Sequence, residues 1–252
     1  LNLANTAGAV ADVNGQSVSV GSLTGGGATG GLVALGTGTL TVGTDNTSTT
    51  YSGVFSGSGS VVKTGGGGFV WSPSVSSTLS NLTLNQGMLR NPGVSVFTSI
   101  GTITRGTGAS WVAALNTGTI TTGAPLTNGI IGPWALGGSG VNLKYLTTTG
   151  GTVGLFTSSF VSQVSQLIDT TGTSNFETNA SGTVPAQYSG NTLRVTGAAT
   201  ITPGATSFEL NGIVNSAGGL VTIGAVLGSS GTIRAGTTRE LVVATNDQAT
   251  TV

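Results

Sequence analysis

The side chains best suited to acid–base catalysis in this chain are seven carboxylates, and they are scattered along it. They are Asp12, Asp45, Asp169, Glu177, Glu209, Glu240 and Asp247. Enzymes that cleave polysaccharides cluster two or three carboxylates, or hold calcium through carboxylates beside a basic residue. No two acids here are closer than seven residues, although stacked repeats could bring distant ones together. We therefore expect no catalytic residues, only isolated acids in turns or in solvent.

Histidine and cysteine are absent from all 252 residues. Their absence excludes a Ser-His-Asp triad, a His-ligated metal and a thiolate metal site within this chain. The stretch "TDNTS" (44–48) offers oxygen ligands on a turn, but the EF-hand loop and the Gly-Gly-x-Gly-x-Asp repeat of calcium-binding β-rolls are missing. An Asx turn is the favoured interpretation there. We expect no metal and no other cofactor.

The glycines of "TGGGG" (64–68) raise the question of a phosphate-binding loop. A P-loop continues from glycine into Lys-Ser/Thr and joins a strand to a helix, and neither feature is present here. We predict instead a corner at which a β-solenoid turns. Lys63, directly before the glycines, is then expected to be a solvated lysine on the exterior.

Three tryptophans, Trp71, Trp111 and Trp134, leave two interpretations open. Exposed rings stack on sugars and would give a glycan-binding surface. Alternatively, the rings fill a wide interior or cap the end of a coil, which is the favoured interpretation. We assign no binding site to them.

The charges are few and balanced, with seven acidic and seven basic residues. No basic patch is available for nucleic acid or an anionic membrane, so we expect no nucleic-acid partner. No apolar run approaches the ~18 residues that a membrane span needs, so this segment is not expected to insert. The chain starts at Leu1 and stops on "ATTV", and we interpret it as a piece of a longer protein.

The elements that would carry these residues are short β-strands. Apolar and small polar residues alternate over four to six positions and end at Gly or Asn, as in "GTGTLTVGT", "STLSNLTLNQG" and "NTLRVTG". Some dozen to fifteen such strands are expected. One helical pattern stands out at 157–170, where Phe160, Val164, Leu167 and Ile168 have helical spacing and predict a short helix or an amphipathic loop.

Self-similarity along the chain decides the fold prediction. The unit "G-S/T-apolar-x-apolar" recurs, with 45 glycines as punctuation. This favours an all-β, single-stranded parallel β-helix with Val, Ile and Leu inside and Thr and Ser outside. We expect about a dozen coils of roughly 20 residues and a right-handed winding. A β-sandwich or barrel competes, because many short strands fit it too.

Four stretches carry a family resemblance. "GSLTGGG" (21–27) and "LGTGTLTVGTDNTSTTYSGVFSGSGSVVKTGGGGFVWS" (35–72) resemble the autotransporter-associated β-strand repeat, and Lys63 matches the lysine of that family. Phe69, Val70 and Trp71 depart from its usual "TLTL". "NGIIGPWALGGSG" (128–140) resembles a segment of giant repeat-bearing bacterial surface proteins, and "ELVVATNDQATTV" (240–252) is similar to a terminal strand of the same module.

The resemblance implies a parallel β-helix, export to the bacterial surface or the extracellular space, and no catalytic residues. We expect one continuous solenoid over 1–252. Within it, 1–124 holds the autotransporter-type repeats, 125–190 is less regular, and 191–252 holds a second run of repeat-like strands.

The leading functional hypothesis is a non-enzymatic stalk or fibre. The alternatives are an adhesin that recognises glycan or another cell and, third, a carbohydrate-active enzyme. Because both ends read as further strands without a polar cap, we expect copies or tandem repeats to stack end to end. Leu1, Leu3, Leu241, Val242 and Val243 are the candidate stacking residues.

Overall fold

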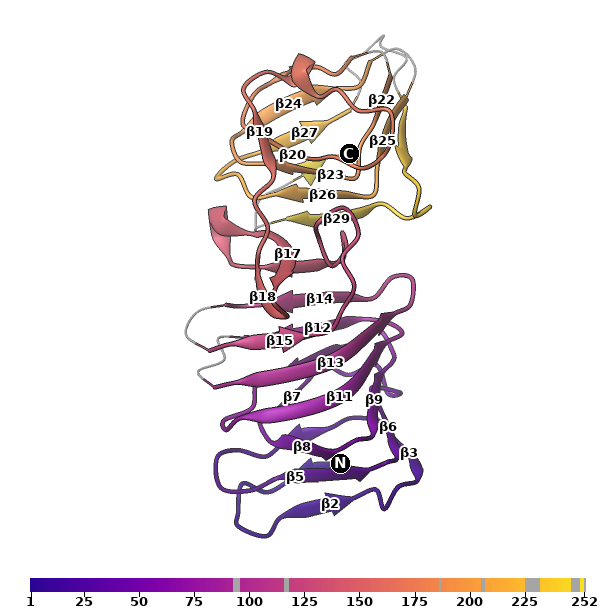
Figure 1. The fold of residues 1–252 in the computed structure, drawn as a ribbon, viewed down its shortest axis with the longest axis vertical. Helices are drawn as coiled ribbons and strands as arrows, with labels where there is room; N and C mark the ends of the chain where they lie inside the picture. Colours follow the sequence, from indigo (N-terminus) through magenta and orange to yellow (C-terminus); the bar gives the residue numbers. More distant parts are fainter. Residues whose placement is uncertain are drawn as a thin grey trace. The chain divides into compact units, whose positions relative to one another are not determined.

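The protein is an all-β solenoid of about 10 turns, built from stacked parallel strands (Figure 1). The computed structural model describes residues 1–92, 96–115, 118–185, 187–204, 207–224, 232–245 and 250–251. Within these ranges the only helical segments are two short 3₁₀ turns, η1 (Gly140–Asn142) and η2 (Val164–Gln166). The fold class predicted from the sequence is confirmed, with slightly fewer turns than expected, and the strand pairing is not that of a sandwich of antiparallel sheets.

The chain divides into two compact units. The first contains Leu1–Leu126 and Leu146–Gly154, and the second contains Thr127–Tyr145 and Leu155–Val252. Two strands contain a boundary between the units, β17 (Lys144–Thr149) and β18 (Thr152–Leu155). The single continuous solenoid over 1–252 stays a prediction.

Three rows of parallel strands form the first unit. One row is β1 (Asn2–Leu3), β4 (Thr24–Gly25), β7 (Thr49–Tyr51), β10 (Gly68–Trp71), β12 (Met88–Asn91) and β14 (Ser110–Ala113). A second row is β2 (Val10–Asp12), β5 (Leu32–Gly36) and β8 (Val54–Gly57). The third is β3 (Ser17–Val20), β6 (Thr39–Val42), β9 (Ser60–Lys63), β11 (Ser77–Leu84), β13 (Thr98–Arg105) and β15 (Ile120–Thr122). Antiparallel β18 follows β15.

Alternation along the strands sorts side chains into core and surface, as the sequence pattern predicts. Leu40, Val61, Leu82 and Ile103 pair in register along the third row, and all four are buried. The residues directly before and after each of them lie on the other face and are mostly Thr and Ser, which the pleat turns outward. Each coil therefore stacks one apolar side chain on the coil before it.

The second unit has its own three rows. One row is β19 (Ser159–Val161), β20 (Asn175–Thr178), β23 (Thr192–Val195), β26 (Gly212–Asn215) and β29 (Val242–Thr245). A second row is β21 (Gly182–Thr183), β24 (Ala199–Thr202), β27 (Val221–Ile223) and β30 (Thr250–Thr251). The third is β22 (Gln187–Ser189), β25 (Ser207–Leu210) and β28 (Ile233–Ala235). Figure 1 shows β20, β23, β26 and β29 one above another in this unit. All pairs within these rows are parallel.

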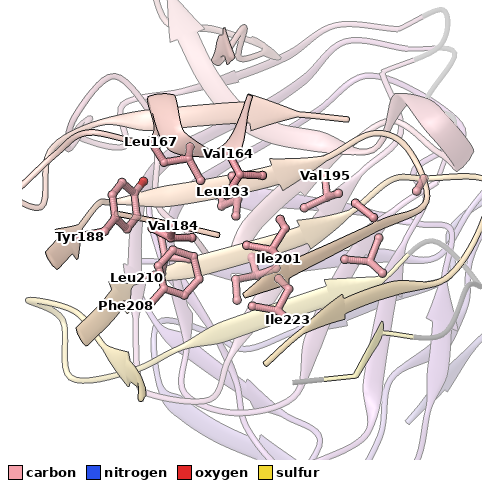
Figure 2. Close-up of a cluster of buried hydrophobic side chains, with 14 residues drawn as sticks. Val164, Leu167, Val184, Tyr188, Leu193, Val195, Ile201, Phe208, Leu210 and Ile223 are labelled. Carbon is pink, nitrogen blue, oxygen red and sulfur yellow. The ribbon is translucent and has the colours of Figure 1, made fainter. Parts of the chain in front are cut away.

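Fourteen buried apolar side chains fill the interior of the second unit, and Figure 2 shows them drawn as sticks. Leu193, Ile201, Phe208 and Ile213 come from three different faces of the coil, and each is fully buried. Tyr188 stacks on Phe208 with ring centroids 5.2 Å apart. At ~25 cal/mol per Å² of apolar surface, this enclosed core is the main stabilising contribution to the unit.

The helical pattern at 157–170 is only partly realised. Phe160 lies in β19 and is 55% exposed, and Ile168 is 74% exposed, so the four residues do not share one face. Val164 and Leu167 do point into the core beside Leu193 (Figure 2). The 3₁₀ turn η2 is closed by a reciprocal capping box between Gln163 and Gln166. Of the two predicted alternatives, a short helix or an amphipathic loop, the segment is closer to the loop, because its only helical part is the single 3₁₀ turn η2 after strand β19.

Candidate functional site: buried polar sites and outer strands

The segment 64–67 is a corner between β9 and β10, as predicted, but Lys63 does not lie in solvent. Its side chain occupies the last inward position of β9 and is 1% exposed. The ammonium donates to the carbonyl oxygens of Thr64 at 2.5 Å, Gly65 at 2.8 Å and Gln86 at 3.2 Å. Burial lowers the pKa of Lys63 below its ordinary value. The prediction of a solvated lysine was wrong because the corner turns backbone carbonyls inward, where an ammonium can bind them.

Glycines make this corner possible. Gly65 has a φ of 69°, in the left-handed region, and a Cβ there would lie 2.0 Å from the carbonyl oxygen of Gly43 in the preceding coil. Gly43 and Gly87, which lie at the corners before and after, also have positive φ. A side chain at any of the three positions is therefore disfavoured by both conformation and contact.

Two tryptophans are interior residues. Trp71 is 1% exposed and Trp111 is fully buried, so the packing interpretation holds for both. Asn91 lies between them: its amide nitrogen donates to the carbonyl of Trp71 at 2.9 Å, and its oxygen accepts from the Trp111 indole at 2.7 Å. Trp134 is half-buried, so for this tryptophan both interpretations, contact with a sugar and packing in the protein, remain open.

A ladder of asparagines runs through the second unit. Asn191 donates to the side-chain oxygen of Asn175 at 2.8 Å, and Asn211 donates to that of Asn191 at 3.0 Å. Asn175 donates onward to the carbonyl of Asn128 at 2.6 Å, and Asn211 accepts from Thr238 at 2.8 Å. All three ladder residues are buried, so each bond satisfies a polar group that water cannot reach.

A strap, defined as Thr127–Tyr145, covers the outer face of the row that contains β23 and β26. Leu143 and Tyr145 of the strap pack with Val214 of β26 in one buried cluster. The strap contains η1 and β16 (Ala135–Gly137), and β16 pairs antiparallel with β17. The strap therefore covers a face of this row that would otherwise be open to solvent.

Arg194 of β23 fastens the strap. Its side chain is 4% exposed, and the guanidinium donates to the carbonyls of Leu143 at 2.8 Å and Val141 at 2.5 Å. It also pairs with the carboxylate of Glu177 at 2.5 Å. A buried guanidinium needs such partners, since leaving its charge unpaired costs several kcal/mol, on the order of 3–5.

Asp12, Asp45 and Asp169 are held in turns, and Glu177 is held in an ion pair. Asp45 accepts from the backbone and hydroxyl of Thr47, which confirms the Asx turn predicted in "TDNTS". Asp12 makes the same kind of turn with Asn14. Glu209 and Glu240 are half-buried, and Asp247 lies outside the described residues. Within the described ranges no three acidic side chains gather as metal ligands would.

Among the carboxylates in the described part of the chain, Asp169 is the most enclosed. It accepts from the backbone and hydroxyl of Thr171, at 2.7 and 2.6 Å, and from the backbone of Thr173 and Ser174, at 3.1 and 2.8 Å. Burial raises its pKa, but the hydrogen bonds from Thr171 and Ser174 outweigh burial and lower the pKa to about 2. All four bonds close a turn, so this carboxylate has a structural role.

The proposed stacking residues lie on or beside the outermost strands of their rows. Leu1, directly before β1, is 46% exposed, whereas Leu3 within β1 is buried. Val242 and Val243 begin β29, where Val243 is 42% exposed, and Leu241 is half-buried just before that strand. In the described part of the chain, β1 and β29 each pair with a neighbouring strand on one side only. Their role in association stays a prediction.

Sequence reasoning missed the asparagine ladder and the Arg194 clamp. A signal for the ladder was present, because Asn175, Asn191 and Asn211 each stand at or directly before a strand at coil-like spacing. No signal pointed to Arg194, whose carbonyl partners lie more than fifty residues away along the chain. None of the helices in the described ranges is long and apolar enough to cross a membrane.

Comparison with known proteins gives one similarity to report. The chain is 44% identical over 92 residues to the adhesin BmaC autotransporter of Brucella suis biovar 1 (strain 1330). The match covers 36% of this chain and 3% of that protein, so the chain spans a small part of its relative's length. No model of a known protein family matches, and no solved structure matches. The similarity is thus to a short stretch of a much longer autotransporter adhesin.

Proposed function

We propose that this chain is a non-enzymatic β-solenoid segment of a bacterial surface protein, of the autotransporter-passenger type. The observation that carries the proposal is the 44% identity over 92 residues to an autotransporter adhesin, in a chain that folds as a parallel solenoid. Its repeats are of the autotransporter-associated β-strand kind. A solenoid holds its two ends apart and exposes long faces, which suits a stalk on a cell surface.

The environment of the polar residues supports a structural role. Asp45 and Asp169 accept hydrogen bonds that close their own turns, and Glu177 is bound to Arg194. A general acid or base must instead be free to reach a substrate proton. Asp45 and Asp169 hold backbone groups of their own turns, and Glu177 holds the guanidinium of Arg194.

Adhesion is the second candidate function, because the similar protein is named an adhesin. Exposed apolar side chains such as Phe97 and Phe160, together with half-buried Trp134, offer surfaces on which a sugar ring or a protein could pack. If the chain is an adhesin, the solenoid contributes contacts with a ligand in addition to length.

Surface location is tested on intact cells of the bacterium that produces the protein. Antibodies raised against the folded chain should label intact cells as strongly as permeabilised ones, and external protease should abolish the signal. A cytoplasmic protein in the same cells serves as the control for lysis. Label that appears only after permeabilisation would contradict the proposal.

Binding distinguishes the stalk from the adhesin. The purified chain is applied to immobilised glycans and to cultured host cells, beside Trp134→Ala and Phe160→Ala. Saturable binding that either substitution weakens at least ~10-fold would support the adhesin, since an aromatic contact is worth about 1.4 kcal/mol or more on that scale. Equal, unsaturable binding by all three proteins would leave the stalk as the function.

We also propose that copies or tandem repeats associate end to end through the strands that carry Leu1, Leu3, Leu241, Val242 and Val243. An outermost strand has unpaired N–H and C=O groups, which can pair with the edge of another chain. The balanced charge of seven acids and seven bases removes long-range repulsion. Light scattering over a concentration series should show mass rising with concentration, and Val243→Lys should reduce the rise. A constant monomer mass at high concentration would refute subunit stacking.

A further inference from the structure

The corner around Lys63 has the composition of a cation site. Three backbone carbonyl oxygens, from Thr64, Gly65 and Gln86, converge on one point within 3.2 Å of the ammonium nitrogen. Rings of carbonyls of this kind replace the hydration shell of a monovalent cation. We call these three carbonyls, with Gly43 and Gly87, the carbonyl cage.

Glycines reserve the space for the cation. A Cβ at Gly87 would lie 2.9 Å from the Lys63 nitrogen, and a Cβ at Gly43 would lie 3.3 Å from it. The cage is thus closed by two glycines of the neighbouring coils, both with positive φ. Residues from three successive coils contribute, so an ion held here ties the coils together.

We infer that the carbonyl cage is a binding site for a monovalent cation, which the chain fills with its own ammonium. The three N–H donors of Lys63 match the three carbonyls, and the side chain is 1% exposed. Removing the ammonium leaves three converging carbonyls without donors. A free cation then binds in its place, either potassium, which is similar in size to the ammonium group, or an alkylammonium, which also replaces the aliphatic stem.

Rescue of Lys63→Ala tests this inference. Thermal unfolding is followed by circular dichroism at constant ionic strength, with choline chloride replaced stepwise by n-propylammonium or potassium chloride. In choline the variant should unfold roughly 5–10 °C below the wild type, as expected for losing a few kcal/mol in a chain of this size. Propylammonium supplies the missing stem and charge, so it should recover about half of the lost unfolding temperature and its effect should saturate. Potassium should recover a smaller part.

Lys144→Ala is the matched control, because Lys144 is the other lysine of the chain and is half-exposed. This variant and the wild type should respond equally to every salt. Neutral 1-propanol controls for simple filling of the cavity. The inference is wrong if propylammonium and potassium shift Lys63→Ala no more than they shift the wild type, or if propanol restores as much as propylammonium.

Two further measurements decide the matter if Lys63→Ala does not fold. Lys63→Met keeps the stem but removes the charge, and wild-type stability of this variant would overturn the inference. In the wild type, an acetylating reagent should label Lys63 at least ~100-fold more slowly than Lys144, because labelling must wait for local opening. The two rates should become similar in urea. Equal rates in the folded protein would show that the ammonium is not enclosed.

Discussion

Several buried polar side chains of this protein bind backbone carbonyls, most of which lie outside the strand ladders. Lys63 binds three carbonyls, Asn91 binds the carbonyl of Trp71, and Arg194 binds two carbonyls of the strap. The reason is geometric: at corners the backbone leaves the strand ladder, and its polar groups need other partners. Side chains with several donors supply them.

Asp169 should make stability depend on pH in the acid range. Its pKa in the folded protein is about 2, below the ordinary value of 3.8, so the unfolded chain takes up the proton first as the pH falls. The contribution of Asp169 is therefore fully present above about pH 4 and is lost as the pH falls towards 2. Asp169→Asn should be less stable by about 2 kcal/mol at neutral pH.

Urea unfolding at several pH values measures this effect. The difference between Asp169→Asn and the wild type should shrink as the pH falls below about 4. Asp12→Asn, in an exposed Asx turn, is the control and should change stability by less than about 0.5 kcal/mol. A difference for Asp169→Asn that stays constant down to pH 2 would show that its charge does not matter.

At the scale of the element, a repeated Tyr-Ser-Gly corner links sequence to structure. In the first unit a Cβ at Gly53 would lie 1.9 Å from the carbonyl oxygen of Gly31 and 2.7 Å from the Tyr51 hydroxyl. In the second unit a Cβ at Gly190 would lie 2.1 Å from the Tyr188 hydroxyl. In both places the tyrosine ring folds over the glycine two residues later.

Gly53→Ala should therefore destabilise the protein by about 3 kcal/mol, because the backbone of the adjacent coil has to move. Gly154→Ala is the matched control, since a Cβ there meets nothing within 4 Å. That change should be neutral or should stabilise by up to about 1 kcal/mol. Chemical unfolding of both variants measures the two effects, and a similar cost for both would contradict the close-contact explanation.

The asparagine ladder makes a second prediction at this scale. Asn191→Ala removes the bonds to Asn175 and Asn211 and leaves buried amide groups without partners. We expect a loss of about 3 kcal/mol in the free energy of unfolding. Asn179→Ala, on the exposed surface just after β20, should stay within about 0.5 kcal/mol of the wild type. Wild-type stability of Asn191→Ala would mean that the ladder is replaceable.

The strap should loosen when its clamp is removed. Arg194→Met keeps most of the volume but leaves Glu177 and two strap carbonyls unpaired, which should cost about 3 kcal/mol. Hydrogen exchange should then rise first around η1. Arg90→Met, at an exposed position of β12, is the control and should leave exchange in the strap unchanged. Unchanged protection in Arg194→Met would show that apolar packing alone holds the strap.

At the scale of the whole molecule, a core substitution should destabilise the coils next to it more than distant ones. In a solenoid each coil contacts only its neighbours, so local damage is felt most in the adjacent coils. Ile201→Ala in β24 opens a cavity in the core of the second unit and should cost 2–5 kcal/mol. Hydrogen exchange should increase most in β21, β24 and β27 and less in β19. A uniform increase over the entire unit would indicate all-or-none unfolding instead.

The sequence by itself determined the solenoid and the face on which most side chains lie. Period-2 alternation places the apolar residues of a strand on one side, and repeated glycine marks the places where the chain turns. For this reason the stacking of Leu40 on Val61, the Asx turn at Asp45 and the corner at 64–67 were all predictable. The Asx turn and the corner depend on residues close together along the chain, and the stacking of Leu40 on Val61 depends on the regular repeat from one coil to the next.

Only the tertiary structure decided the partners of the buried polar groups. Whether Lys63 points inward depends on carbonyls turned in by its own corner and on Gln86 of the next coil. Arg194 is buried because the strap, some fifty residues earlier, lies over its strand. Alternation determines on which side of a strand a residue lies, but not which segment covers that side. From sequence alone, a charged residue on the outer face is therefore predicted to be solvated until the covering segment is known.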